Sequence, residues 1–371
     1  MSKVTNRLMH VTFLAVLVVV VPATSAEAQL GKLAGRAAQA KDKVDQARDL
    51  IITEKEEIAM GAAISEKLRQ KYGVVQNQAV HKYVTLVGRV LALSSAKPNL
   101  TWHFVVLDTD GVNAFAAPGG YVHITRGALA LIRNESELAG VLGHEIAHVT
   151  EQHTIKAIKK SKWVDAGAGA LTQNQLLDRF TQAAYENIVE NGFDRDDENT
   201  SDELGLKMAN GAGYAPTGLG VFLTKLAERN KDLKERSGAF ASHPETRSRL
   251  DRLKNQISKD KLTGAATVAA RYSSTITYKP IPVTAVTTVA PGAATKTADA
   301  ATEKPSGGSR FGVGSLTSKL GGEKTSDATV ASAGSRGVNP DRDAKGGSNP
   351  RVVSVTVTAA EIAAFRTGIA G

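Results

Sequence analysis

The sequence predicts an α+β fold that is mainly α-helical, with a small β-sheet and a long disordered C-terminal tail. Apolar residues recur at helical spacing through much of residues 53–262. Residues 100–125 instead combine alternating apolar and polar side chains with turn residues, as β-strands do. Beyond Leu262, Ala, Thr, Ser, Gly and Pro dominate and the apolar periodicity fades.

Helices are expected where the apolar spacing is sustained, and strands where it alternates. The stretch 100–108 predicts a strand, and two short strands are expected around the turn at residues 118–120. Residues 154–175 are expected to form a loop or a frayed helix. The expected helices span residues 53–72, 78–94, 135–153, 176–190, 197–210, 216–229 and 244–257.

The first 28 residues predict a secretory signal peptide. Basic residues precede an apolar run over residues 11–21, and Ala26-Glu27-Ala28 fits a cleavage site. A membrane anchor is the alternative, but a span needs about 20 apolar residues. Residues 29–52 predict a linker or a loose helix. We therefore expect an exported, periplasmic protein, with secretion as the alternative.

Composition excludes some classes of chemistry. The chain has no cysteine, which excludes disulfides, thiol catalysis and a lipoprotein anchor. The formal charge of +9 favours anionic surfaces, yet no nucleic-acid motif is found. Lys156, Lys159, Lys160 and Lys162 beside Trp163 allow a peripheral membrane contact, and a solvated loop is the alternative.

The motif His144-Glu145-Ile146-Ala147-His148 predicts a metal site. Two histidines four residues apart on a helix lie about 40° apart, so both imidazoles can bind one ion. Glu145 lies about 100° from His144, beside the ion, where it can act as a general base on a zinc-activated water. His153 would lie about 180° from His144 on a continuous helix and is not expected to join the pair.

A catalytic zinc needs a third protein ligand and one open position. Glu198 is preferred because Asp202, one helical turn later, can accept the free ring N–H of a zinc-bound histidine. Glu186 and Glu190 are the alternative third ligands. We therefore expect one Zn²⁺ per chain.

Two further stretches are candidates for the active site. Asn113, Ala114 and Phe115 begin an apolar stretch that can bind an extended peptide through main-chain hydrogen bonds, with a buried hairpin as the alternative. His243 can reach the fourth zinc position or stabilise the oxyanion, or it can have no role at the metal.

Four ordered blocks resemble the HtpX/BepA-like, CAAX-prenyl-protease-like gluzincin family of zinc metallopeptidases, in its periplasmic type. The resemblance implies zinc on His144, His148 and Glu198, with Glu145 as base and Asp202 behind the ligands. Residues 200–202 read Thr-Ser-Asp where the family usually has Glu-Ala-Asp, which keeps the spacing. The blocks are "NAFAAPGGYVHITRGAL", "NESELAGVLGHEIAH", "RDDENTSDELG" with "GAGYAP", and "SHPETRSRL", in which Arg247 is placed near the cleft.

The sequence therefore predicts a zinc-dependent endopeptidase of the cell envelope. The resemblance implies that its substrates are unfolded or misassembled envelope proteins. The alternative function is a zinc-stabilised chaperone or outer-membrane assembly-quality-control module with suppressed proteolysis. The expected organisation is a zinc metallopeptidase domain over 53–262, a low-complexity disordered segment over 263–350, and a strand-helix tail over 351–371, which either docks or stays loose.

Overall fold

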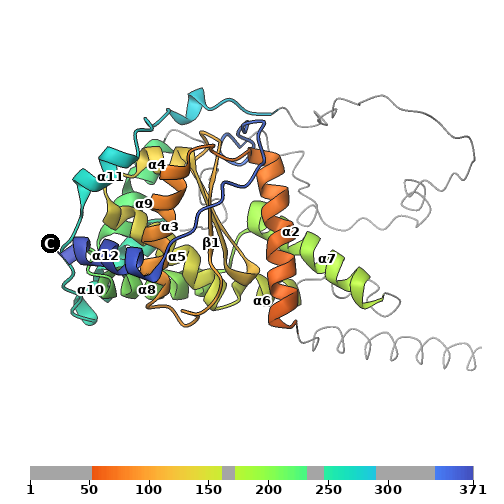
Figure 1. Cartoon of the computed structure of the whole chain (residues 1–371), viewed down its shortest axis with the longest axis horizontal. Coiled ribbons are helices and arrows are strands. Elements are labelled where there is room, and N and C mark those ends of the chain that lie inside the picture. Colours follow the sequence, from red (N-terminus) through yellow and green to blue (C-terminus); the bar gives the residue numbers. More distant parts are fainter. Residues whose placement is uncertain (1–51, 161–171, 232–245, 290–338, 371) are drawn as a thin grey trace, which may run out of the picture.

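The computed structural model describes residues 52–160, 172–231, 246–289 and 339–370 (Figure 1). The predicted signal peptide and almost all of the predicted linker lie outside these residues, as do residues 290–338 of the predicted disordered segment. No helix within the described ranges combines the length and apolar character that a membrane crossing requires.

The sheet has three strands in the order β1-β3-β2. Strand β1, His103–Leu107, runs parallel to β3, Tyr121–Thr125, and β2, Ala114–Ala117, runs antiparallel to β3. The short 3-10 helix Pro118–Gly120 connects β2 to β3, and Gly119 has a φ of 70°, which favours glycine. The predicted strands and turn are thus confirmed, with the first strand shorter than expected.

The helices surround this sheet, and most agree with the predicted stretches. Two differences stand out: the helix expected over 135–153 ends at Thr150, and a new helix begins at His153 and includes residues 154–160 of the stretch expected to be a loop or a frayed helix. The described helices are α2 Glu54–Tyr72, α3 Gln78–Ala92, α4 Arg126–Leu131, α5 Glu135–Thr150, α6 His153–Lys160, α7 Gln173–Glu186, the π-helix Asn187–Asn191, α8 Arg195–Gly211, α9 Gly218–Arg229, α10 Thr246–Lys259, α11 Ala269–Thr275, the 3-10 helix Val283–Ala285 and α12 Ala359–Ala370.

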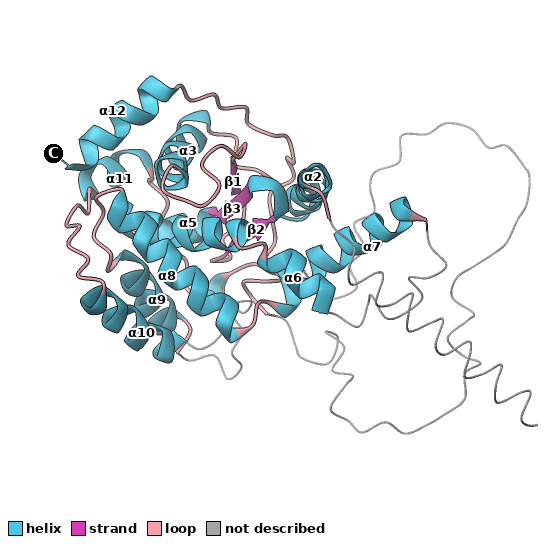
Figure 2. Cartoon of the chain, turned by 90° about the horizontal axis from the view of Figure 1, so that it is seen from below, coloured by secondary structure: helices cyan, strands magenta, loops and turns pink. Residues whose placement is uncertain are grey.

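Alternate strand residues face two separate apolar clusters. Phe104 and Val106 of β1 belong to the cluster formed with α3, α5, α8 and α9, whereas Val105 and Leu107 belong to the cluster formed with α2 and α7. Figure 2 shows the strands between α5 on one side and α2 on the other. This period-two alternation is what a sheet covered on both faces requires.

Helix α5 lies at the centre of the domain. Residues 135–149 are all buried, and the helix packs against α8, α9, α3 and β2. The backbones of α5 and α8 touch at a glycine pair. A Cβ on Gly205 would lie 2.6 Å from His144 N, and one on Gly143 would lie 2.9 Å from Gly205 O. The two helices can approach this closely only because neither residue has a side chain.

The segments after α10 pack on the domain. Tyr272 of α11 is buried and donates a hydrogen bond to Leu129 O, and Arg271 pairs with buried Glu135. The prediction of disorder is therefore wrong for residues 263–289. The prediction was wrong because amino-acid composition does not reveal specific polar contacts with distant residues, such as the ion pair between Arg271 and Glu135.

Residues 339–350 also contact the domain, so the prediction of disorder is wrong there too. Gly347 N lies 3.0 Å from Tyr72 O and 2.8 Å from Asp108 O. Residues 287–289 and 343–345 are joined by two main-chain hydrogen bonds of 2.7 and 2.9 Å. Residues 289 and 343, which are far apart in the sequence, are therefore adjacent in space (Figure 1).

The last segment docks through a helix. Residues 351–357 form no strand, which corrects the prediction of a strand there. Helix α12 packs on α3 and buries Ile362 and Ile369. Of the two alternatives for the tail, docking is the one observed.

We expect Gly205→Ala to destabilise the protein by about 1–3 kcal/mol, because its methyl group would meet the backbone of α5. Gly211→Ala is the matched control, since it ends the same helix and its Cβ would meet nothing closer than Ser94 Oγ at 3.7 Å. Urea unfolding of both variants measures the difference. Equal stability of the two would contradict the role given to the glycine pair.

We expect Glu135→Ala to cost about 3–5 kcal/mol, because it leaves the partners of a buried carboxylate unmatched. Glu135 is fully buried and accepts hydrogen bonds from Tyr83, Tyr214 and Arg271. Glu228→Ala, which removes an exposed ion pair with Lys231, should cost about 0–1 kcal/mol. Calorimetry of both variants tests this, and a similar small loss in each would refute it.

Candidate active site

The two motif histidines lie on one face of α5. His144 and His148 are both buried, and their Nε2 atoms are 3.0 Å apart. Asn134 caps the helix by accepting a hydrogen bond from Glu137 N. The four-residue spacing therefore brings both imidazoles to one point, as the sequence predicts.

Helix α8 supplies the carboxylate of Glu198 to the same point. Its Oε2 lies 3.5 Å from His144 Nε2, and its Oε1 lies 3.4 Å from His148 Nε2. Ligand atoms about 2.0 Å from a tetrahedral zinc lie about 3.3 Å from one another, so these three residues fit the ion. Among the described residues they form the only such group, and the alternatives Glu186 and Glu190 are not part of it.

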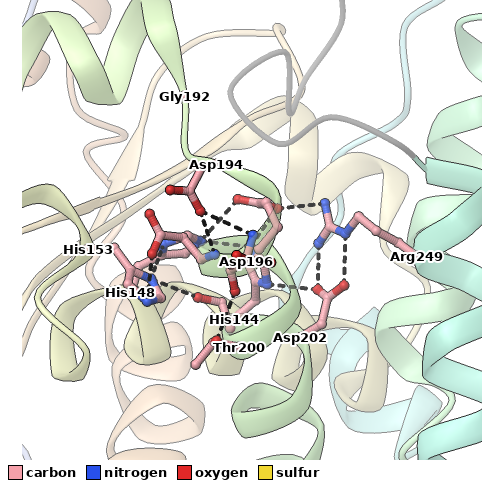
Figure 3. A network of polar contacts seen from close by, with 12 residues as sticks. His144, His148, His153, Gly192, Asp194, Asp196, Thr200, Asp202 and Arg249 are labelled. Carbon is pink, nitrogen blue, oxygen red and sulfur yellow. Dashed lines mark hydrogen bonds and ion pairs between the residues drawn. The ribbon is translucent and has the colours of Figure 1, made fainter. Parts of the chain in front are cut away.

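Asp202 lies one turn after Glu198 and reaches the other nitrogen of His144. Its Oδ1 is 3.0 Å from His144 Nδ1 (Figure 3). Burial lowers the pKa of His144, but the nearby carboxylates of Glu198 and Asp202 outweigh this, so its pKa is raised. A carboxylate at this position fixes the ring with its Nε2 toward the metal site.

Arg249 of α10 joins the two acidic residues of α8. Its guanidinium is fully buried, bonds both oxygens of Asp202 at 2.6 and 2.8 Å, and lies 2.9 Å from Glu198 Oε2. Burial raises the pKa of Asp202, but Arg249 and His144 outweigh this and lower it to about 2. Arg249 therefore offsets the negative charge that the site concentrates.

Sequence reasoning missed Arg249 and considered Arg247 instead. Residues 249, 253 and 257 follow one another at four-residue spacing, and Leu253 and Ile257 pack in the core. An arginine in this apolar stripe must be buried with a carboxylate partner. That pattern is the signal that could have identified it.

His153 contacts His148, which corrects the expectation that it lies on the far side of the helix. Helix α5 ends at Thr150, Gln152 has a φ of 56°, and α6 starts at His153. The His153 ring thus turns back, with its Nδ1 3.0 Å from His148 Nδ1. Burial, together with the charge of Lys156, lowers the pKa of His153 to about 4. It is not one of the three clustered ligand residues.

The remaining predicted residues divide into three cases. Glu145 is fully buried on α5, next to His144. Asn113, Ala114 and Phe115 are buried at the start of β2, where Asn113 exchanges main-chain and side-chain hydrogen bonds with Thr125. His243 lies outside the described residues.

Known proteins similar to this chain include two bacterial proteases and a mitochondrial metalloendopeptidase. The beta-barrel assembly-enhancing protease of Yersinia pestis is 27% identical over 219 residues, which cover 56% of this chain and 45% of that protein. Metalloprotease YcaL of Escherichia coli (strain K12) is 26% identical over 164 residues, 43% of this chain and 63% of that protein. Mitochondrial metalloendopeptidase OMA1 of Arabidopsis thaliana is 28% identical over 160 residues, 43% of this chain and 33% of that protein.

The chain thus spans less than half the length of the assembly-enhancing protease that it matches. The model of peptidase family M48 matches residues 77–257. That range contains His144, Glu145, His148, Glu198 and Arg249, and so the whole of the site described above. The match over residues 77–257 confirms the resemblance to this metallopeptidase family that the sequence motifs predicted.

Proposed function

We propose that this chain is a zinc-dependent endopeptidase, a hydrolase of internal peptide bonds. The observation that carries the proposal is the buried group of His144, His148 and Glu198, in which the two Nε2 atoms are 3.0 Å apart and each lies 3.5 or 3.4 Å from one carboxylate oxygen of Glu198. Two imidazole nitrogens and a carboxylate oxygen are a donor set of catalytic zinc, and three protein ligands leave one position open.

The residues around this group have separate tasks in hydrolysis. When bound, zinc supplies a Lewis acid that polarises the substrate carbonyl and makes a water acidic. Glu145, beside His144 on α5, takes the proton from the attacking water and delivers it to the leaving amine. Asp202 holds the His144 ring, and Arg249 pairs with both carboxylates of α8 and holds them in place.

We infer that the substrates are unfolded or misassembled proteins of the cell envelope. Strand β2 is at the edge of the sheet, the position at which an extended peptide can pair through main-chain hydrogen bonds, although residues 114–117 are buried in the described structure. Recognition through main-chain hydrogen bonds suits substrates that share no common sequence of side chains. The name of the Yersinia pestis relative, a beta-barrel assembly-enhancing protease, supports an envelope role.

The proposed location follows from the N-terminal sequence. Basic residues, an apolar run and an A-x-A site precede residue 29, which supports export. Lys156 and Lys160 are exposed on α6 and support peripheral contact with anionic lipid, although Lys160 also pairs with Asp194 at 3.2 Å. The periplasm is the compartment that fits both features.

A second function is favoured by the same relative's name. A protein that enhances assembly can act by binding its clients, and a zinc-stabilised chaperone with suppressed proteolysis would conserve the same fold and metal site. The two functions differ in whether purified, zinc-loaded protein cuts an unfolded protein such as casein.

We expect Glu145→Gln to lower casein cleavage by about 10²–10⁴-fold, because it removes the general base. Zinc content should stay at one per chain in this variant, while His148→Ala and Glu198→Gln should fall well below one, because each removes a ligand. Elemental analysis and a casein assay, each with and without chelator, measure both properties. If wild-type protein bearing one zinc prevents aggregation yet never cleaves casein, the binding function replaces the proteolytic one.

We expect Arg249→Met to destabilise the metal-free protein by about 3–5 kcal/mol, because Asp202 and Glu198 lose the cation between them. Zinc should restore part of this loss, since it brings positive charge to the same carboxylates. Lys254→Met, at an exposed position of α10, is the control and should change little. Urea unfolding with and without zinc decides, and equal stability of both variants would contradict the role of Arg249.

A further inference from the structure

His148 presents its second ring nitrogen to another histidine. Its Nε2 faces His144 and Glu198, and its Nδ1 lies 3.0 Å from His153 Nδ1 (Figure 3). A neutral imidazole that binds a metal through Nε2 carries its proton on Nδ1. His153 Nδ1 must then be the acceptor of that proton.

The other contacts of His153 agree with this assignment. A neutral ring that accepts at Nδ1 carries its own proton on Nε2, and His153 Nε2 lies 3.4 Å from Asp197 Oδ1. The hydroxyl of Ser201 is 3.2 Å from His153 Nδ1 and can donate to the same acceptor. The Asp197 contact therefore places the proton on His153 Nε2, and the Ser201 contact is compatible with the same tautomer.

The backbone is arranged to put His153 at this place. Gln152 has a φ of 56°, in the left-handed region that residues other than glycine rarely adopt. Its side-chain amide donates a hydrogen bond to Glu57 of α2, which holds the turn. Without this turn, the helix would continue and carry His153 away from His148.

Phe193 fixes the plane of the ligand ring. Its ring stacks on that of His148 with a centroid distance of 4.0 Å and an interplanar angle of 27°. The ring of His148 is thus restrained by Phe193 on its face and by His153 at its edge. His144 differs, because the carboxylate of Asp202 contacts its Nδ1 directly.

We propose that His153, oriented by Asp197, is a positioning residue that accepts the Nδ1 proton of His148 and so aims its Nε2 at the metal. The site already buries Glu145, Glu198 and Asp202. An imidazole in place of a further carboxylate fixes the tautomer without adding negative charge. The inference rests on the proposed zinc function.

The test measures zinc affinity by competition with a chromophoric chelator. His153→Leu removes the acceptor and should weaken zinc binding by about 10–100-fold. His153→Asn places an amide oxygen near the position of Nδ1, so it should stay within about threefold of wild type. His103→Leu, at a β1 histidine that stacks on Tyr121 instead, is the control and should bind zinc like wild type.

A second readout uses the wild-type protein alone. In zinc-loaded protein, long-range proton–nitrogen correlation spectra should place protons on His148 Nδ1 and His153 Nε2. This readout keeps the inference testable if thermal unfolding of the metal-free protein shows that His153→Leu fails to fold. A proton on His153 Nδ1, or equal zinc affinity of folded His153→Leu and wild type, would overturn the inference. A wild-type protein that binds no zinc would instead overturn the proposed function.

Discussion

The site depends on the close approach of two helix backbones. At Gly143 and Gly205, α5 and α8 are so close that a methyl group would not fit between them. Because the axes are this near, the short side chain of Glu198 reaches both imidazoles, and Asp202 reaches the far nitrogen of His144. One contact between helices thus fixes both Glu198, a proposed metal ligand, and Asp202, the carboxylate that contacts His144.

The close approach of α5 and α8 also buries two carboxylates, whose negative charge is balanced by a residue of a third helix. Glu198 and Asp202 are buried within one turn of each other, and charges are costly to bury unless they are paired. Arg249 brings a cation from α10 and bonds both. The acidic site therefore forms only when α5, α8 and α10 are packed together, so the proposed metal binding would be coupled to folding.

Local patterns in the sequence predict most of the fold. The period of the apolar residues places the main helices, and alternation places the three strands. Residues four apart on helices, His144 with His148 and Glu198 with Asp202, were identified because their spacing alone brings them to one face. Each of these inferences depends only on residues that are close together in the sequence.

The features that the sequence did not reveal depend on contacts between distant segments. His153 reaches His148 through the positive φ of Gln152, and nothing in the residue type of Gln152 signals that conformation. Arg271 binds a carboxylate 136 residues away, at Glu135. The composition of the region around Arg271 predicted disorder. The region is nevertheless ordered, because Arg271 pairs with Glu135 and the ring of Tyr272 is buried in the core.

The pairing of residues 287–289 with 343–345 makes two distant stretches of the chain depend on each other. Two main-chain hydrogen bonds of 2.7 and 2.9 Å join them. Because each stretch supplies main-chain partners to the other, removal of one would leave polar backbone groups of the other without those partners. The stretch that follows α11 and the stretch that precedes α12 are therefore held in place together.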